Sequence, residues 1–592
     1  MENKKEIKGG AFMVQPADPQ DIFIPDEFDE EQKMIAQTCQ DFLDTEVFPV
    51  LDRIDNQEEG LIDSLLTKAG EMGLLGISLP EEYEGFDQSF VTAMLSSEVM
   101  GSAYSYAVAY SCHTGIGSLP IAYYGNEKQK EKYLPKLATG EWKGAYCLTE
   151  PGAGSDANAG KTQAVLSEDG KHYILNGQKM WITNSGFADV FTVFAKIDND
   201  RVLSAFIVER SFPGIVFNPE EKKMGIKGSS TRQIFFNDVK VPVENLLAKR
   251  GQGYRIALNI LHMGRLKLGG SVIGAAKRSI MHAVNYATER KQFGMLISNF
   301  GSIKHKLAQQ VILTYATEST VYRASGNVDE LTEIYMADRE KGQATVTAFA
   351  QLAIEAAAMK VFGSESLDYV VDETLQIYGG MGYSAEMPAE RAYRDSRINR
   401  IFEGTNEINR ILIVDTILKR AQRKEIPLYV KAEEVYQSLS NLTATQLPES
   451  YFERKQAQIE DLKKVGLTIL WALVKKFERK WVYEQEILNN ISDIIMQIYV
   501  TESVLLRVWK LEKTMNQEAL GIRKDILNTL LFDSTSLIQI AARNAVNSFA
   551  EGDEYRLLMN GINQWTQTDA VNCKEARRRI ADQLIEDKRY AF

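Results

Sequence analysis

Apolar positions recur with a helical period along most of the chain, and one stretch of short β-rich runs interrupts this pattern. In the first part, the period predicts helices over residues 28–47, 62–71, 90–111 and 126–137. The helix at 90–111 is apolar nearly all round, which indicates a buried helix. Residues 1–27 contain three prolines without periodicity, so we expect an extended arm there.

The pattern changes near Gly144, where short runs rich in β-branched and aromatic residues alternate with turn residues. These runs predict strands at 172–175, 190–196, 203–209, 215–218 and 233–236. Their regular spacing is typical of a small barrel or sandwich.

Helical periodicity returns at about Gly253, is interrupted at Ile426-Pro427, and then continues toward the end of the chain. The predicted fold is therefore mainly α with a central β-domain. We expect five parts: an arm (1–27), a helical domain (28–143), a middle β-domain (144–250), a helical bundle (251–425) and a C-terminal helical domain (430–592).

Composition narrows the classes of function. The chain has 592 residues and a net charge of -12, and its longest basic block is Arg577–Arg579, which argues against nucleic-acid binding. The four cysteines lie far apart without a C-x-x-C pair, so neither a disulfide framework nor a metal site is expected. The N-terminal residues resemble no targeting signal, which favours a cytoplasmic location. The most apolar run, Val465–Val474, is too short to span a bilayer.

A glycine-rich segment (376–383) and a lone carboxylate within 401–408 carry the first chemical signal. Gly379 and Gly380 allow backbone to approach a ligand closely. Glu403 follows Ile401 and Phe402 at the entrance of a predicted helix, where a desolvated carboxylate can act as a base. The alternative is that Glu403 only favours the positive end of that helix.

Two stretches in the β region carry ligand-type signals. The segment 147–156 (CLTEPGAGSD) is a loop rich in backbone donors and hydroxyl groups. The segment 180–184 (MWITN) places an aromatic side chain beside a hydroxyl, which suits a flat heteroaromatic ring. Each alone is also compatible with an ordinary turn or core strand.

Together these segments resemble the acyl-CoA dehydrogenase family of flavoenzymes over residues 28–425. The matching motifs, in family order, are CLTEPGAGSD (147–156), MWITN (180–184), FFNDVKVP (235–242), ATERKQFG (287–294), QIYGGMGY (376–383) and IFEGTNEI (401–408). The extension at 430–592 resembles the very-long-chain branch, which has an additional C-terminal helical domain.

The resemblance implies that FAD lies between the bundle and the β-domain. Its implied contacts are Tyr146, Cys147, Leu148, Thr149, Gly154, Ser155, Trp181, Ile182, Thr183, Arg290, Gln292, Phe293, Gln376, Gly379, Gly380, Thr405 and Glu407. Arg290 would reach an FAD bound across a subunit contact. The implied substrate contacts are Ser155, Arg265 and Gly404. Some family members have glutamine where this chain has Gly301, which puts one FAD contact in doubt.

The resemblance also implies that Glu403 is the catalytic base. In a subset of the family the base lies at the position of Gly264, and glycine cannot accept a proton. Two hydrogen bonds to the thioester carbonyl, from the Glu403 backbone N–H and the flavin ribityl chain, would stabilise the developing enolate.

The implied activity is FAD-dependent α,β-dehydrogenation of long-chain fatty acyl-CoA to trans-2-enoyl-CoA in β-oxidation, with electrons passed to electron-transferring flavoprotein. The alternatives are an acyl-CoA oxidase that uses oxygen and a non-catalytic flavin-binding scaffold. Residues 107–115 would form part of the acyl tunnel, where small residues leave room for a long chain unless Tyr106 or Tyr110 blocks it.

We further expect a homodimer, because the C-terminal domain would cover the surface by which shorter relatives pair two dimers. The alternative is a loosely tethered accessory domain. A third hypothesis is that the C-terminal domain contacts a membrane surface through Lys463, Lys464, Trp471, Lys475 and Lys476. Such residues more often flank a buried helix.

Overall fold

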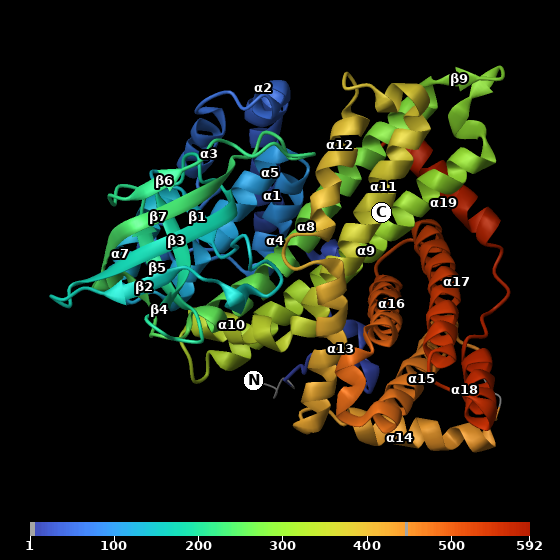
Figure 1. Cartoon of the computed structure of the whole chain (residues 1–592). Coiled ribbons are helices and arrows are strands. Elements are labelled where there is room, and N and C mark those ends of the chain that lie inside the picture. The colour runs from blue at the N-terminus through green and yellow to red at the C-terminus, as the bar shows by residue number, and fades with distance from the viewer. Residues whose placement is uncertain (1–5, 444–447) are drawn as a thin grey trace.

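The computed structural model describes residues 6–443 and 448–592, and it confirms the predicted mainly helical fold with a central β-domain. In Figure 1 the β-domain lies on the left, the C-terminal helices lie at the lower right, and the long helices of the bundle lie between them.

The first helical part packs beside the β-domain. Its helices are α1 (Glu30–Phe42), α2 (Leu51–Asp55), α3 (Leu61–Glu71), α4 (Phe90–Gly101), α5 (Ser105–Ser111), α6 (Leu119–Tyr124) and α7 (Glu127–Thr139). The prediction of one helix over 90–111 is wrong, because the chain breaks between α4 and α5. Tyr104 has a left-handed φ of 53°, which a continuing helix does not allow.

The middle domain is one eight-stranded sheet. Its strands are β1 (Gly144–Cys147), β2 (Gln163–Leu166), β3 (His172–Thr183), β4 (Val190–Ile197), β5 (Ser204–Glu209), β6 (Ile215–Phe217), β7 (Thr231–Pro242) and β8 (Leu246–Leu247). They follow the order β6-β7-β3-β2-β4-β5-β8, and β1 pairs in parallel with β4. β3 and β7 run well beyond the short strands predicted there, because the bulges in β3 interrupt the alternation.

The sheet is strongly curled. The ring of Phe191 in β4 lies 5.7 Å from that of Phe217 in β6, although several strands separate β4 from β6 in the sheet order. The side chains inside this curl form their own hydrophobic cluster. The curl agrees with the barrel-like arrangement predicted from the spacing of the strands.

The bundle contains α8 (Gly253–Glu289), α9 (Gly301–Tyr335), α10 (Lys341–Gln351), α11 (Ala353–Tyr378), α12 (Pro388–Ser396) and α13 (Asn406–Gln422). A two-stranded hairpin of β9 (Lys291–Gln292) and β10 (Met295–Leu296), which the helical pattern missed, joins α8 to α9 and projects from the bundle in Figure 1.

Glycines allow α4 and α8 to approach closely, as the Gly269-Gly270 pair predicted. A Cβ built at Gly274 would lie 1.8 Å from the carbonyl oxygen of Glu98, and one built at Gly270 would lie 2.5 Å from the sulfur of Met94. A larger residue at either position would therefore separate the two helices.

The C-terminal helices are α14 (Leu428–Ser438), α15 (Tyr451–Phe477), α16 (Gln485–Leu511), α17 (Gln517–Asn547), α18 (Gly552–Trp565) and α19 (Cys573–Asp587). α16 and α19 both pack on α9 of the bundle. Buried ion pairs cross this junction: Arg323 of α9 bonds to Glu502 of α16 at 2.8 Å, and Arg507 of α16 bonds to Glu318 of α9 at 2.6 Å. The domain is thus firmly attached, which contradicts a loose tether.

The residues considered for membrane contact are partly turned inward. Lys463 is buried and bonds to Glu502 at 2.6 Å, and Trp471 packs edge-on against Tyr429. In the described part of the chain, no single helix is long and apolar enough to cross a membrane, although the bent pair α10 and α11 meets that criterion together.

Candidate active site

The candidate base lies in a strained turn between α12 and α13. Glu403 has a φ of 57° and Gly404 has a φ of 81°, so two consecutive residues are left-handed. This conformation is costly for glutamate, and such strain concentrates at functional sites. Thr405 then caps α13, because its hydroxyl accepts a hydrogen bond from the Ile408 N–H at 3.3 Å.

Three side chains hold the carbonyl groups of this turn. Arg265 of α8 donates from Nε to the Glu403 carbonyl at 3.1 Å. Asn409 of α13 donates to the Gly404 carbonyl at 2.7 Å, and Lys360 of α11 donates to the same oxygen at 2.8 Å. The strained turn is therefore fixed from three helices.

The Glu403 carboxyl group lies against the backbone of α8. A Cβ built at Gly264 would lie 2.8 Å from Oε2 of Glu403, so the two positions face one another. Oε2 is buried and has no hydrogen-bond partner among the described residues. Burial raises the pKa of Glu403 to about 7, although the charges of Arg265 and Lys360 act in the opposite direction.

Residues from the β-domain and from α5 complete the surroundings of Glu403. The buried Tyr146 hydroxyl has no partner within the described ranges, and Glu403 raises the pKa of Tyr146 beyond the effect of burial. Cys112 follows α5 in the π-helical turn Cys112–Gly117, and its sulfur lies 4.0 Å from the Thr183 carbonyl. Its pKa is likewise raised, first by burial and then by Glu403.

The predicted ring-binding loop follows β1 and is hydrogen-bonded to β3. Lys179 donates to the Leu148 carbonyl at 3.2 Å and to Glu150 at 2.6 Å, and Met180 N–H donates to the Thr149 carbonyl at 3.0 Å. Cys147 is buried beneath this loop, whereas Gly154 and Ser155 are exposed. A Cβ built at Gly154 would meet nothing within 4 Å, so the loop leaves open space beside it.

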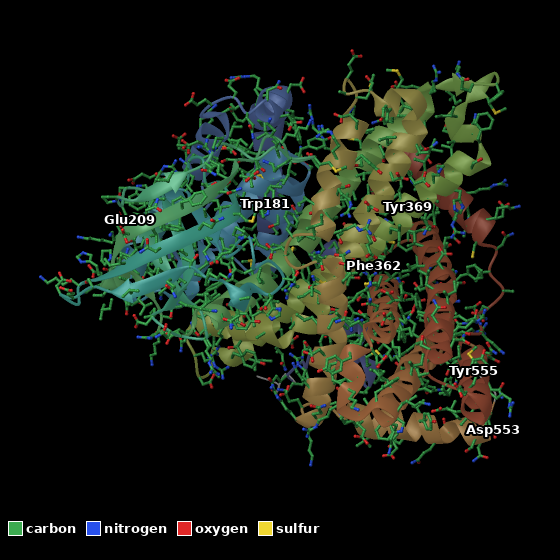
Figure 2. All side chains as sticks on the ribbon, viewed as in Figure 1. Trp181, Glu209, Phe362, Tyr369, Asp553 and Tyr555 are labelled. Atoms are coloured by element: carbon green, nitrogen blue, oxygen red, sulfur yellow. The ribbon has the colours of Figure 1, made fainter. Side chains whose placement is uncertain are left out.

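Trp181 interrupts β3 at a bulge. It has a φ of 59°, and 52% of its surface is exposed, while the next residue, Ile182, is buried. Trp181 lies where the β-sheet adjoins the helices (Figure 2). An exposed tryptophan beside Thr183 offers a flat apolar face together with a hydroxyl.

A second group of predicted residues lies far from Glu403 along the bundle. Arg290, Gln292 and Phe293 are exposed in the β9–β10 hairpin, where 91% of the Phe293 surface is accessible. Arg290 follows the end of α8, 26 residues beyond Gly264, which corresponds to about 39 Å of helix. One chain therefore does not bring this hairpin to its own Glu403.

The glycine-rich segment belongs to that second group. Gln376 lies in the last turn of α11, about 24 Å of helix beyond Lys360, and Gly379 directly follows the end of this helix. Tyr286 and Tyr378 stack with ring centroids 4.1 Å apart and so join the ends of α8 and α11. A Cβ at Gly379 or Gly380 would meet nothing within 4 Å, which leaves backbone accessible to a ligand.

Two further residues predicted to contact ligands, Glu407 and Arg265, make hydrogen bonds mainly to neighbouring residues. Glu407 is exposed in the first turn of α13, and its pKa is lowered by local hydrogen bonds. Arg265 is buried and bonds to His262 at 3.0 Å as well as to the Glu403 carbonyl.

Sequence reasoning did not identify Lys360 or Asn409. A signal was present for Lys360, because it is the only charged residue in the largely apolar stretch between Glu355 and Glu365. Asn409 carried no comparable signal, since asparagine is common in the first turns of helices.

The two groups fit the parts of FAD. The buried Tyr146 hydroxyl, the open loop at Gly154 and the exposed Trp181 suit a flat ring near Glu403, and the open glycines beside Arg290 suit the distant half of a dinucleotide. No group of three or more metal-ligating side chains occurs among the described residues.

Comparisons with known proteins agree with this geometry. Family models match residues 29–141 (Acyl-CoA dehydrogenase, N-terminal domain), 145–239 (middle domain), and both 251–418 and 461–564 (each described as the C-terminal domain). A probable acyl-CoA dehydrogenase of Bacillus subtilis (strain 168) is 43% identical over 98% of both chains. The very long-chain specific acyl-CoA dehydrogenase of Rattus norvegicus is 43% identical over 61% of this chain and 53% of its own length.

A crystal structure of acyl-CoA dehydrogenase complexed with FAD from Bacillus anthracis has a TM-score of 0.95 and 43% identity, and the match covers 99% of this chain and 100% of that one. The C-terminal helices are included in this similarity. The chain belongs to the acyl-CoA dehydrogenase family and is an FAD-dependent acyl-CoA dehydrogenase.

Proposed function

We propose that the chain dehydrogenates long-chain fatty acyl-CoA to trans-2-enoyl-CoA and that Glu403 removes the α-proton. The observation that carries this proposal is the Glu403 carboxyl group, buried without a partner for Oε2 and held in a strained turn against Gly264. A carboxyl group whose pKa is raised to about 7 accepts a proton more readily than an exposed one and is still substantially ionised at neutral pH.

The chain's other residues orient and shield this carboxyl group. Arg265, Asn409 and Lys360 fix the turn, and Cys112 and Tyr146 exclude water from the side facing the β-domain. When bound, FAD supplies the two-electron acceptor for the hydride that leaves the β-carbon. The loop at 147–155 and the segment Trp181–Thr183 would hold its ring.

The preference for long chains is supported by a cavity beyond Glu403. It is lined by Tyr104, Ala107 and Val108 from α5 and the turn before it, and by residues of α8, α11 and α12. On α8 the lining runs from Ser271 to Ser279, about 10 to 22 Å along the helix from Gly264. Val108 lies one helical turn before Cys112, whose thiol is influenced by Glu403, and we propose that the acyl tail passes from Glu403 toward this cavity.

The two tyrosines that were suspected of blocking this path point elsewhere. Tyr106 packs against Phe42, with ring centroids 5.8 Å apart, in the core of the N-terminal helices. Tyr110 donates to the Leu74 carbonyl at 2.8 Å in the same core. Neither side chain lines the cavity, so neither of these two tyrosines closes it to an acyl tail.

A homodimer and electron-transferring flavoprotein are the proposed partners. The hairpin around Arg290 lies too far from its own Glu403, so its predicted cofactor contact requires a second copy. Light scattering of the holoenzyme tests the assembly, for which we expect a dimer; a stable tetramer would contradict it. The relatives named as dehydrogenases favour a flavoprotein acceptor over oxygen.

The decisive experiment for function is anaerobic mixing of the holoenzyme with acyl-CoAs from butyryl to stearoyl, followed by reoxidation with electron-transferring flavoprotein or oxygen. Flavin bleaching should be faster with long chains, and only the flavoprotein should restore the colour rapidly. An optimum at butyryl-CoA would refute the long-chain preference. Rapid peroxide formation would identify an oxidase instead.

A further inference from the structure

Lys360 is a buried cation directly behind the catalytic turn. It lies on α11, two residues before Phe362, which is labelled in Figure 2, and its surface is fully buried. Its Nζ donates to the Gly404 carbonyl at 2.8 Å and to Oδ1 of Asn406 at 2.7 Å. Within the described ranges, Nζ pairs with no carboxylate.

This arrangement is costly for protein stability. A buried ammonium group loses its hydration, and two neutral oxygen atoms compensate only in part. Burial accordingly lowers the pKa of Lys360 to about 7. The helix around it consists mainly of alanine, methionine, valine and phenylalanine, so packing alone would be served better by an apolar residue.

The contacts of Lys360 connect α11 to the segment that directly follows Glu403. Gly404 is the residue after Glu403, and Asn406 is the first residue of α13. The Asn406 amide also donates to Ser364 Oγ at 3.1 Å and to Glu365 at 3.0 Å, both on α11. Lys360 therefore fixes the second left-handed residue of the turn and the start of the following helix.

The electrostatic surroundings link the two groups as well. The ionisable groups that influence Lys360 are Glu403, Arg265, Glu365 and Glu407, and those that couple to Glu403 are Arg265, Lys360, Cys112 and Tyr146. Burial is the main cause of the raised pKa of Glu403, and the charges of Arg265 and Lys360 oppose it. Lys360 thus favours the ionised carboxylate that the proposed reaction requires.

We propose that Lys360 is a positioning residue for the dehydrogenation: it holds the Glu403–Asn406 turn through the Gly404 carbonyl and supplies a positive charge that keeps Glu403 ionised. This inference rests on the proposed role of Glu403 as the base. It assigns two effects to one side chain, a structural one through the hydrogen bonds and an electrostatic one through the charge.

Three variants separate these effects. Lys360→Gln retains a donor near the Gly404 carbonyl but removes the charge, and Lys360→Arg retains the charge. Asn406→Ala removes one partner of Lys360 and leaves its charge in place. For each holoenzyme, FAD content, thermal stability and the rate of anaerobic flavin reduction at saturating long-chain acyl-CoA are measured against pH.

If Glu403 is the base, the reduction rate should rise with pH as Glu403 ionises. Removing a nearby positive charge disfavours the carboxylate, so the midpoint of this rise should move upward by about one pH unit in Lys360→Gln. The variant would then be about tenfold slower below the midpoint and close to wild type well above it. Lys360 has a pKa of about 7 and loses its charge in this range, whereas arginine stays charged, so the midpoint of Lys360→Arg should lie at or below that of wild type. Asn406→Ala should move the midpoint less than Lys360→Gln does, even where the plateau rate falls.

An unchanged midpoint in Lys360→Gln, with FAD bound, would overturn the electrostatic role. If that variant fails to bind FAD, Lys360→Arg still decides, because a midpoint above that of wild type would contradict a role for charge. Failure of the proposed function appears differently: the wild-type enzyme would then show no pH-dependent rise, or Glu403→Gln would reduce its flavin at the wild-type rate.

Discussion

Two glutamates whose carboxyl groups are withdrawn from solvent have opposite surroundings in this molecule. Glu403, at the active site, has one carboxylate oxygen without a partner, and its pKa is raised to about 7 by burial. Glu318, in α9, bonds to Lys277 at 2.5 Å and to Arg507 at 2.6 Å. Burial alone would raise the pKa of Glu318 as well, but these two cations lower it to about 2.

The difference shows how one physical effect, burial, serves two purposes. Near Glu318, the N-terminal arm, α4, α8, α9 and α16 all contribute charged groups, and complete pairing keeps that glutamate ionised. Around Glu403 the two nearest cations bond to backbone carbonyls instead of to the carboxylate. The first region joins domains, whereas the second leaves a carboxyl group free to exchange a proton.

Breaking the paired region should cost the most stability. Arg507→Met leaves Glu318 and Asp26 without their shared partner, and loss of one member of a buried ion cluster typically costs about 3–5 kcal/mol. Denaturant unfolding of the holoenzyme measures this. The matched control is Arg579→Met, which removes an exposed pair with Asp525 and should cost at most about 1 kcal/mol. Equal effects of the two variants would refute the contrast.

Neutralising the unpaired region should instead increase stability. The folded-state pKa of Glu403 is about 7, above the ordinary value of 4.5, so the folded state loses stability as pH rises between these values. Glu403→Gln does not titrate, and above neutral pH its stability should exceed that of wild type by roughly 3 kcal/mol. The free energy of unfolding of both proteins, measured between pH 4.5 and 8, tests this prediction. A difference that does not grow with pH would contradict the raised pKa.

Displacing Glu403 should reduce activity without unfolding the protein. Gly264→Ala places a methyl group 2.8 Å from Oε2, and the flexible carboxyl group moves more readily than the helix backbone. We expect flavin reduction to slow roughly tenfold to a hundredfold, since misplacing a reacting group has effects of this order. Thermal stability should change little. A wild-type reduction rate would show that Glu403 tolerates displacement.

Substitution of a glycine outside both regions should have the smallest effect on stability and activity. Gly521 lies in α17, and a Cβ there would meet nothing within 4 Å. Gly521→Ala should leave the reduction rate unchanged and stabilise the protein by about 0.5–1 kcal/mol through helix propensity. Thermal unfolding and stopped-flow reduction test both parts, and slowed reduction would mean that glycine-to-alanine changes act on activity non-specifically.

The sequence predicted the fold class and Glu403 because both have local signals. Helical and strand periods are local, and Glu403 lies in a motif with a glycine beside it. The break before Tyr104 and the full length of β3 were missed, although Gly101 ends α4 and Gly177 lies at the first bulge of β3, because bulges and left-handed residues interrupt the period on which the prediction relied.

The partners of the buried charged side chains could not be predicted from the sequence, because these partners lie far apart along the chain. Arg507 meets Glu318 across 189 positions and Asp26 across 481. Lys360 likewise reaches the Gly404 carbonyl across 44 positions. No local pattern indicates which buried carboxylate receives a partner and which does not, although this difference distinguishes the two regions.

The most direct test of the central claim is anaerobic flavin reduction by Glu403→Gln. The amide is nearly isosteric, so FAD and acyl-CoA should bind almost as in wild type, but the side chain can no longer accept the α-proton. Loss of a general base typically slows a reaction about a hundredfold to ten-thousandfold. We therefore expect bleaching to slow at least a hundredfold with FAD content unchanged. Bleaching at the wild-type rate would show that Glu403 is not the base.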